Sequence, residues 1–97
     1  MFEKYTARRE TVENIVSAVL QNGASRALDT MEEIKTYQEA WENLSAEEQT
    51  ILRIMCNRRM NKMGRVREAE RTLHITQAMP YKLKRKALDK LGSMLFE

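Results

Sequence analysis

The side chains best suited to chemistry in this sequence are basic and hydrogen-bonding residues in its C-terminal half. At spacings that share one helix face the chain presents Gln77, Ala78, Tyr81, Lys82 and Arg85. Gln and Arg can bond to the edges of DNA bases, Lys can meet phosphate or guanine, and Tyr can touch phosphate or a thymine methyl group. This face is therefore predicted to read bases in the major groove of double-stranded DNA.

Further residues around this face are predicted to contact the phosphates of the same DNA. They are Arg58, Arg59, Lys62, Arg65, Arg67, Arg71, Thr76 and Lys84. Residues 51–97 carry twelve Lys and Arg against four Asp and Glu, a net charge of +8, whereas residues 1–50 carry five against ten, a net charge of −5. The basic half should attract a polyanion and the acidic half should repel one.

Residue types that catalysis or metal binding requires are scarce. The chain has a single cysteine, Cys56, and a single histidine, His74, and it contains no phosphate-binding loop, metal-ligand spacing or nucleophile motif. Carboxylates such as Glu47 and Glu48 fall in the first turns of predicted helices, where the helix dipole already explains them. We therefore expect a protein that is not an enzyme and that uses no cofactor and no metal ion.

Length and composition narrow the fold class. A chain of 97 residues suffices for one compact domain, and its 42% hydrophobic and 32% charged residues are typical of a folded protein. With three Gly, one Pro and many helix formers, the composition favours helices joined by short turns. No apolar run approaches the roughly 20 residues of a bilayer span, so we expect a cytoplasmic protein that does not use a membrane.

Hydrophobic periodicity predicts an all-α single domain of five helices, at about residues 6–21, 29–44, 45–62, 65–73 and 76–96. Asp29 is expected to cap the second helix, and Ser45 with Glu48 forms a capping box that opens the third. Gly64 is expected to break the pattern after the third helix. Thr76 is expected to cap the last helix, which places Pro80 at its fourth position.

The last two predicted helices indicate a helix-turn-helix across residues 65–91. Ala69 is small where two helices must cross closely, and Leu73 and Ile75 flank the turn and can fill the space between them. His74 takes the turn position where many such motifs place Gly, and His tolerates a left-handed backbone better than most residues. The last helix then turns inward Leu83, Ala87, Leu88 and Leu91.

This half of the chain resembles region 4 of bacterial sigma-70-type factors. The resemblance rests on Leu44-Ser45-Ala46-Glu47-Glu48-Gln49, Gly64, Glu68-Ala69, Leu73-His74-Ile75-Thr76, Leu83, Lys86-Ala87-Leu88 and Lys90-Leu91. Residues 81–91 are also similar to phage late-transcription regulators of the ArpU and RinA type. The resemblance implies a phage or prophage setting, and it implies that the family's base-contacting positions are held by Gln77, Ala78, Tyr81 and Lys82.

These features predict a sequence-specific DNA-binding transcriptional regulator. Residues 1–43 are expected to form an acidic helical hairpin, and residues 44–97 a basic helix-turn-helix unit within the same compact domain. The acidic half is expected to contact RNA polymerase or a second copy of the chain, giving a homodimer. The alternative is a sigma-like adaptor or inhibitor that binds RNA polymerase or another protein rather than DNA.

Overall fold

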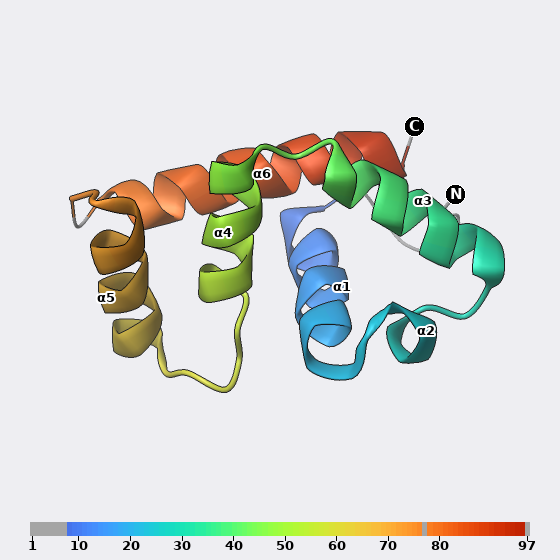
Figure 1. Cartoon of the computed structure of the whole chain (residues 1–97), viewed down its shortest axis with the longest axis horizontal. Helices are drawn as coiled ribbons and strands as arrows, with labels where there is room; N and C mark the ends of the chain where they lie inside the picture. Colours follow the sequence, from blue (N-terminus) through green and yellow to red (C-terminus); the bar gives the residue numbers. More distant parts are fainter. Residues whose placement is uncertain (1–7, 77, 97) are drawn as a thin grey trace.

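A computed structural model describes residues 8–76 and 78–96, which form six α-helices and contain no β-strand (Figure 1). The helices are α1 (Arg9–Asn22), α2 (Ala24–Ala27), α3 (Met31–Glu42), α4 (Ala46–Met55), α5 (Lys62–Leu73) and α6 (Met79–Leu95). The predicted all-α class is confirmed. The predicted number of five was wrong because a single helical turn, α2, follows Gly23, whose φ of 83° ends α1.

The longest helix, α6, runs along the length of the molecule, and α1, α3, α4 and α5 all pack against it (Figure 1). In the same view α5, α4 and α1 extend from one side of α6, with α5 beside its first turns. The molecule measures 37 × 24 × 21 Å. Because α6 touches helices from both halves of the sequence, the described residues share one hydrophobic core.

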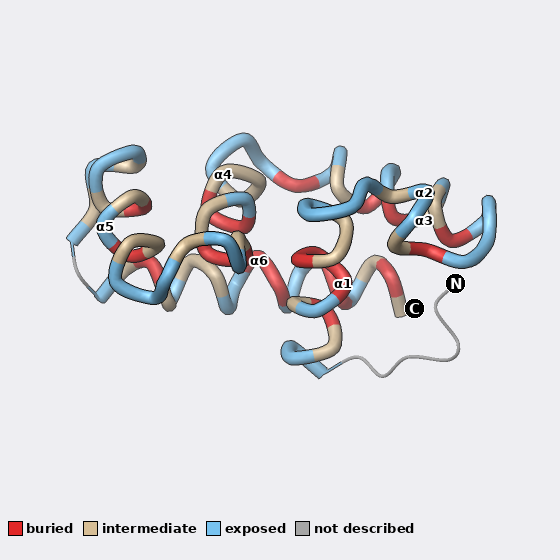
Figure 2. The backbone as a smooth tube through the Cα atoms, turned by 90° about the horizontal axis from the view of Figure 1, so that it is seen from below, coloured by how far each residue is buried: buried red, intermediate tan, exposed pale blue. Residues whose placement is uncertain are grey.

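The core lies where α1, α4 and α6 meet. Figure 2 shows buried stretches of these helices at the centre of the molecule, whereas most residues of the links between helices are exposed. The fully enclosed side chains include Val16, Ile51, Leu52, Leu91 and Leu95. Burial of such residues removes apolar surface from water, which is the main force that holds the helices together.

Met31 of α3 does not join this core. Its side chain is 80% exposed, because it is the first residue of α3 and α3 begins at the outer end of the molecule (Figure 1). The cap of α3 also lies one residue later than predicted. Thr30 Oγ1 accepts from the backbone N–H of Glu33 at 3.1 Å, and Glu33 Oε1 accepts from the N–H of Asp29 at 3.0 Å.

The start of α4 has the predicted capping box. Ser45 Oγ accepts from the backbone N–H of Glu48 at 3.1 Å, and Glu48 Oε1 accepts from that of Ser45 at 2.7 Å. The end of α4 was predicted too late. The helix stops at Met55 and residues 56–61 are not helical, since the carbonyl of Cys56 accepts from the buried Ser17 hydroxyl of α1 at 2.9 Å.

Gly64 does not break a helix, contrary to the prediction, but lies in the first turn of α5. Asn61 starts this helix: its Oδ1 accepts from the N–H of Gly64 at 2.7 Å, so one of the amides without an intrahelical partner is satisfied. Among the six described helices, none combines the length and the apolar character that a bilayer crossing requires.

Candidate nucleic-acid interface

α5 and α6 are joined by a tight turn whose backbone has the predicted left-handed residue. His74 has φ 54° and ψ 47°, and the N–H of Ile75 after it donates to the carbonyl of Glu70 at 3.2 Å. This closing bond is the kind that ends helices at a left-handed residue. The chain thereby reverses sharply, and α5 crosses α6 rather than running alongside it (Figure 1).

α6 begins later than the sequence had suggested. Ala78 is its N-cap, and the carbonyl of Thr76 accepts from the N–H of Met79 at 3.0 Å, so the predicted Thr76 cap was wrong. Pro80 is consequently the second helical residue and not the fourth. Proline fits there because the N–H it lacks would have had no partner inside the helix.

This later start changes how the predicted base-reading residues are distributed. Gln77 lies outside the described residues, and Ala78 is exposed but precedes the helix. Tyr81, Lys82 and Arg85 lie within α6. Tyr81 is half-buried, and its ring centroid is 6.0 Å from Nζ of Lys62 at the start of α5, a cation–π distance that ties the two helices together.

An exposed basic stripe consists of Lys82, Arg85 and Lys86 on the first half of α6. Arg85 and Lys86 follow Lys82 by three and four positions, so the three residues share one face, whereas Pro80 and Ala87 are buried. Within residues 8–76 and 78–96, no hydrogen bond or ion pair engages the three side chains. Their charges are therefore available to a partner, and we call this set the α6 stripe.

Asp89 follows the α6 stripe along the same helix, and its negative charge is paired with Arg9 of α1. Two hydrogen bonds join them, Nε to Oδ1 at 2.7 Å and Nη2 to Oδ2 at 3.0 Å, and they hold the pKa of Asp89 below its ordinary 3.8. These two residues and the α6 stripe border a shallow hollow of about 390 Å³. Four cations around one carboxylate leave this surface with a net charge of +3.

Some of the predicted phosphate residues have partners inside the protein. Lys84 Nζ lies 3.0 Å from Glu13 Oε1 of α1, and the two side chains are 17% and 30% exposed. Arg65 Nη1 donates to the carbonyls of Asn57 at 3.3 Å and Met60 at 3.1 Å, which secures the link between α4 and α5. These contacts give both side chains a structural role.

The cations of α5 are more exposed. Arg71 forms an ion pair with Glu68 one turn earlier, and Arg67 and Arg71 both face solvent. Lys62 is exposed at the beginning of α5, and Thr76 is exposed in the turn.

Arg58 and Arg59 lie apart from the α6 stripe. Together with Arg53, the last basic residue of α4, they line a pocket of about 230 Å³ beside the second half of α1. α1 contacts α6 through its first half, at Arg9 and Glu13. The α1 residues that line this pocket, Ser17, Leu20 and Gln21, belong to its second half. The predicted phosphate residues thus fall into two separate groups. Sequence reasoning overlooked Arg53, although its place in the last turn of α4 was a usable signal.

The single cysteine lies in the core. Burial first, and the nearby Glu13 carboxylate second, raise the pKa of the Cys56 thiol to about 12, so the thiol stays protonated at neutral pH. No group of three or more His, Cys, Asp or Glu in the described ranges is arranged to hold a metal ion.

Comparison of the chain with protein-family models, with curated proteins and with solved structures found no match. The function is therefore inferred from the geometry of the α5–turn–α6 unit and from the distribution of charge around it.

Proposed function

We propose that this protein is a sequence-specific DNA-binding transcriptional regulator whose α5–turn–α6 unit is a helix-turn-helix of the sigma region 4 kind. The observation that carries the proposal is the α6 stripe: Lys82, Arg85 and Lys86 are exposed and unpaired within the described ranges. The stripe belongs to the second helix of a pair that cross at a tight turn, which is the helix that enters the major groove in such motifs.

The dimensions of α6 suit this role. An α-helix with its side chains is about 10–12 Å across, and the major groove of B-DNA is about 12 Å wide. The second half of α6 is enclosed by other helices, with Leu88, Leu91 and Leu95 buried, so the first half is the part that can enter a groove. We assign Lys82 and Arg85 to base edges and Lys86 to phosphate, because recognition helices read bases with their N-terminal residues.

Charge supports the same surface. The hollow bordered by Arg9, Asp89 and the α6 stripe has a net charge of +3, and each cation brought to a phosphate releases a counterion from the duplex. The acidic half, residues 1–50 with a net charge of −5, is repelled by DNA. We propose that it binds RNA polymerase or a second copy instead, and that the setting is phage or prophage, as the resemblance of residues 81–91 suggests.

One feature favours a second candidate function, that of a protein-binding adaptor. A groove of about 440 Å³ is lined by apolar and aromatic residues of α1 and α3, including Val19, Tyr37 and Trp41. Leu20 at its edge is 38% exposed. Apolar grooves of this kind accept partner side chains, so an adaptor would be expected to use this face rather than the α6 stripe.

The decisive experiment is selection from a randomised DNA pool at two salt concentrations. We expect one motif to be enriched, with binding that weakens as salt rises. The double variant Lys82→Ala, Arg85→Ala should lose the motif while it keeps its helical circular dichroism. The matched control is Arg26→Ala, Lys35→Ala, which removes two exposed positive charges from α2 and α3 and should bind as the unaltered protein does.

Two results would contradict DNA reading. The first is an unenriched pool with weak, salt-sensitive binding, and the second is an equal loss in both double variants. If, in addition, regulation of transcription is altered only by substitutions in the α1–α3 groove, the adaptor function is supported.

A further inference from the structure

The arginines at the end of α1 opposite α6 form a cluster that the proposed DNA interface does not use. Arg53, Arg58 and Arg59 line one pocket with the polar residues Ser17, Gln21 and Asn57 and with Leu20 and Cys56. No carboxylate borders this pocket, and within residues 8–76 and 78–96 no ion pair engages any of the three arginines. We call this pocket, with its three arginines, the arginine pocket.

The framework of the arginine pocket is secured by hydrogen bonds from both sides. Ser17 of α1 donates to the carbonyl of Cys56 at 2.9 Å, which attaches the start of the α4–α5 link to α1. Asn57 Oδ1 accepts from the backbone N–H of Arg59 at 3.1 Å and shapes the next turn of the link. The positions from which the arginines project are therefore held before any ligand arrives.

Two of the guanidinium groups are also positioned by neighbours that leave donors free. The Arg58 guanidinium donates through Nη2 to the side-chain oxygen of Asn14 on α1. The Arg53 guanidinium lies over the ring of Trp41, 5.7 Å from its centroid. Since a guanidinium has five N–H donors in a plane, stacking on a ring or one bond to an amide leaves several N–H groups for an oxyanion.

The C-terminal ends of α1 and α4 lie at this pocket. Because the C-terminal end of a helix dipole is negative, these ends by themselves would favour positively charged side chains nearby. Each helix end acts as roughly half a negative charge. Two such ends offset about one of the three positive charges, so a net charge of about +2 remains. The helix dipoles alone thus leave most of the positive charge without a counterpart.

We propose that the arginine pocket binds the phosphate group of a small molecule, either free phosphate or a phosphate monoester. Three arginines that line one pocket match a group with oxygens on all sides. Arg suits phosphate because its guanidinium can bond to two oxygens at once. The pocket volume of about 230 Å³ is below the range of roughly 300–1,000 Å³ usual for drug-sized ligands. It therefore suits a phosphate group better than a larger molecule.

Duplex DNA is a less suitable occupant. Arg58 contacts the middle of α1 and the pocket continues to Gln21 near its end, whereas α6 meets α1 near its beginning, at Arg9. A duplex that lies on the α6 stripe would lie near Arg9 at the start of α1, and not at the arginine pocket beside the second half of α1. The pocket is thus a site of its own, and its occupancy is independent of DNA reading.

The test is a titration of the isotope-labelled full chain, followed by the NMR signals of the backbone amides of residues 57–60 and the indole N–H of Trp41. The probes are inorganic phosphate and ribose 5-phosphate, at constant ionic strength maintained with chloride. We expect saturable shifts confined to these signals. Tighter binding of inorganic phosphate would indicate a site for free phosphate, and tighter binding of ribose 5-phosphate would indicate a site for a monoester. The double variant Arg58→Ala, Arg59→Ala should bind at least about tenfold more weakly.

The control is Lys82→Ala, Arg85→Ala, which removes the same charge from the α6 stripe and should bind phosphate unchanged. Circular dichroism confirms that both variants are folded. Shifts that rise linearly without saturation would overturn the proposal, and so would equal weakening in both variants or displacement of phosphate from the pocket by duplex DNA. The variant Lys82→Ala, Arg85→Ala should lose the selected DNA motif but keep phosphate binding, so the two proposals can fail separately.

Discussion

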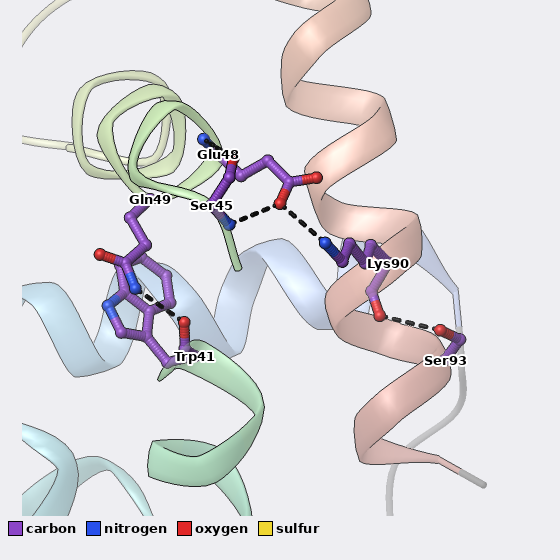
Figure 3. A network of polar contacts seen from close by, with 6 residues as sticks. All are labelled: Trp41, Ser45, Glu48, Gln49, Lys90 and Ser93. Carbon is purple, nitrogen blue, oxygen red and sulfur yellow. Dashed lines mark hydrogen bonds and ion pairs between the residues drawn. The ribbon is translucent and has the colours of Figure 1, made fainter. Parts of the chain in front are cut away.

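Glu48 of α4 and Lys90 of α6 form an ion pair with 3.0 Å between Oε1 and Nζ, and the same carboxylate completes the cap of α4 (Figure 3). The backbone hydrogen bond from Ser45 is the largest of the contacts that hold the pKa of Glu48 below its ordinary 4.5. Figure 3 also shows the Gln49 side chain donating to the carbonyl of Trp41 at 2.8 Å. The start of α4 is thereby attached to both α3 and α6.

This relationship predicts how stability depends on pH. Because the folded pKa of Glu48 is lowered, its carboxylate stabilises the fold above the unfolded pKa of 4.5, and that contribution is lost as the pH falls through the folded pKa. We expect the free energy of unfolding in urea to decrease as the pH is lowered from about 6 to about 3. Glu48→Gln, which can still accept the Ser45 hydrogen bond, should make this decrease shallower. An unchanged pH profile in this variant would contradict the assignment.

The ion pair between Lys84 and Glu13 predicts that Lys84 stabilises the fold. The sequence had instead suggested that Lys84 contacts DNA phosphate. Lys84→Ala and Glu13→Ala should each lower the free energy of unfolding, and a double-mutant cycle should give a coupling of about 0.5–1 kcal/mol. Urea unfolding of the four proteins measures this coupling. A coupling of zero, with weaker DNA binding by Lys84→Ala than by Lys86→Ala, would instead favour phosphate contact.

The burial of Ala69, where α5 packs against its neighbours, predicts that a larger side chain at this position destabilises the fold. Its side chain is fully buried, with 0% exposed, so a larger residue must displace the packing around it. We expect Ala69→Leu to lower the free energy of unfolding by about 1–3 kcal/mol. The control is Ala46→Leu at the exposed start of α4, which should change it by less than about 0.5 kcal/mol. Equal effects in urea unfolding would show that Ala69 is not confined.

His74 predicts opposite effects of two replacements in the turn. Its backbone has a φ of 54°, which Gly adopts without strain and a β-branched residue adopts with difficulty. His74→Val should lower the melting temperature and reduce the free energy of unfolding by about 1–2 kcal/mol. His74→Gly should leave the melting temperature unchanged or raise it. Destabilisation by Gly equal to that by Val would mean that the His74 side chain, and not its backbone, holds the turn.

The assignments along α6 predict different effects on DNA binding. Lys86→Ala should weaken binding to all sequences alike and reduce the salt dependence by about one unit of log–log slope. Arg85→Ala should relax the preference at one base position and leave the slope less affected. Titrations of the selected site and of point-changed sites at several salt concentrations measure both quantities. If the two variants behave identically, Arg85 contacts phosphate and not a base.

The sequence by itself was enough for features whose partners lie within a few residues. The capping box joins Ser45 and Glu48, which are three positions apart, and the left-handed turn at His74 depends on that residue and the helix end before it. The helical class followed in the same way from spacings of three and four. Local geometry leaves such residues few alternatives, so their pattern is sufficient to predict them.

Tertiary structure decided what depended on residues far apart in the chain. The end of α4 is set by Ser17 reaching Cys56 across 39 positions, a contact with no local signature. Lys82 and Lys84 are the same residue type two positions apart, yet Lys84 faces Glu13 of α1 whereas Lys82 faces solvent. A helix turns by about 100° per residue, so the packing of α6 against α1 determines which of its cations are available to a ligand.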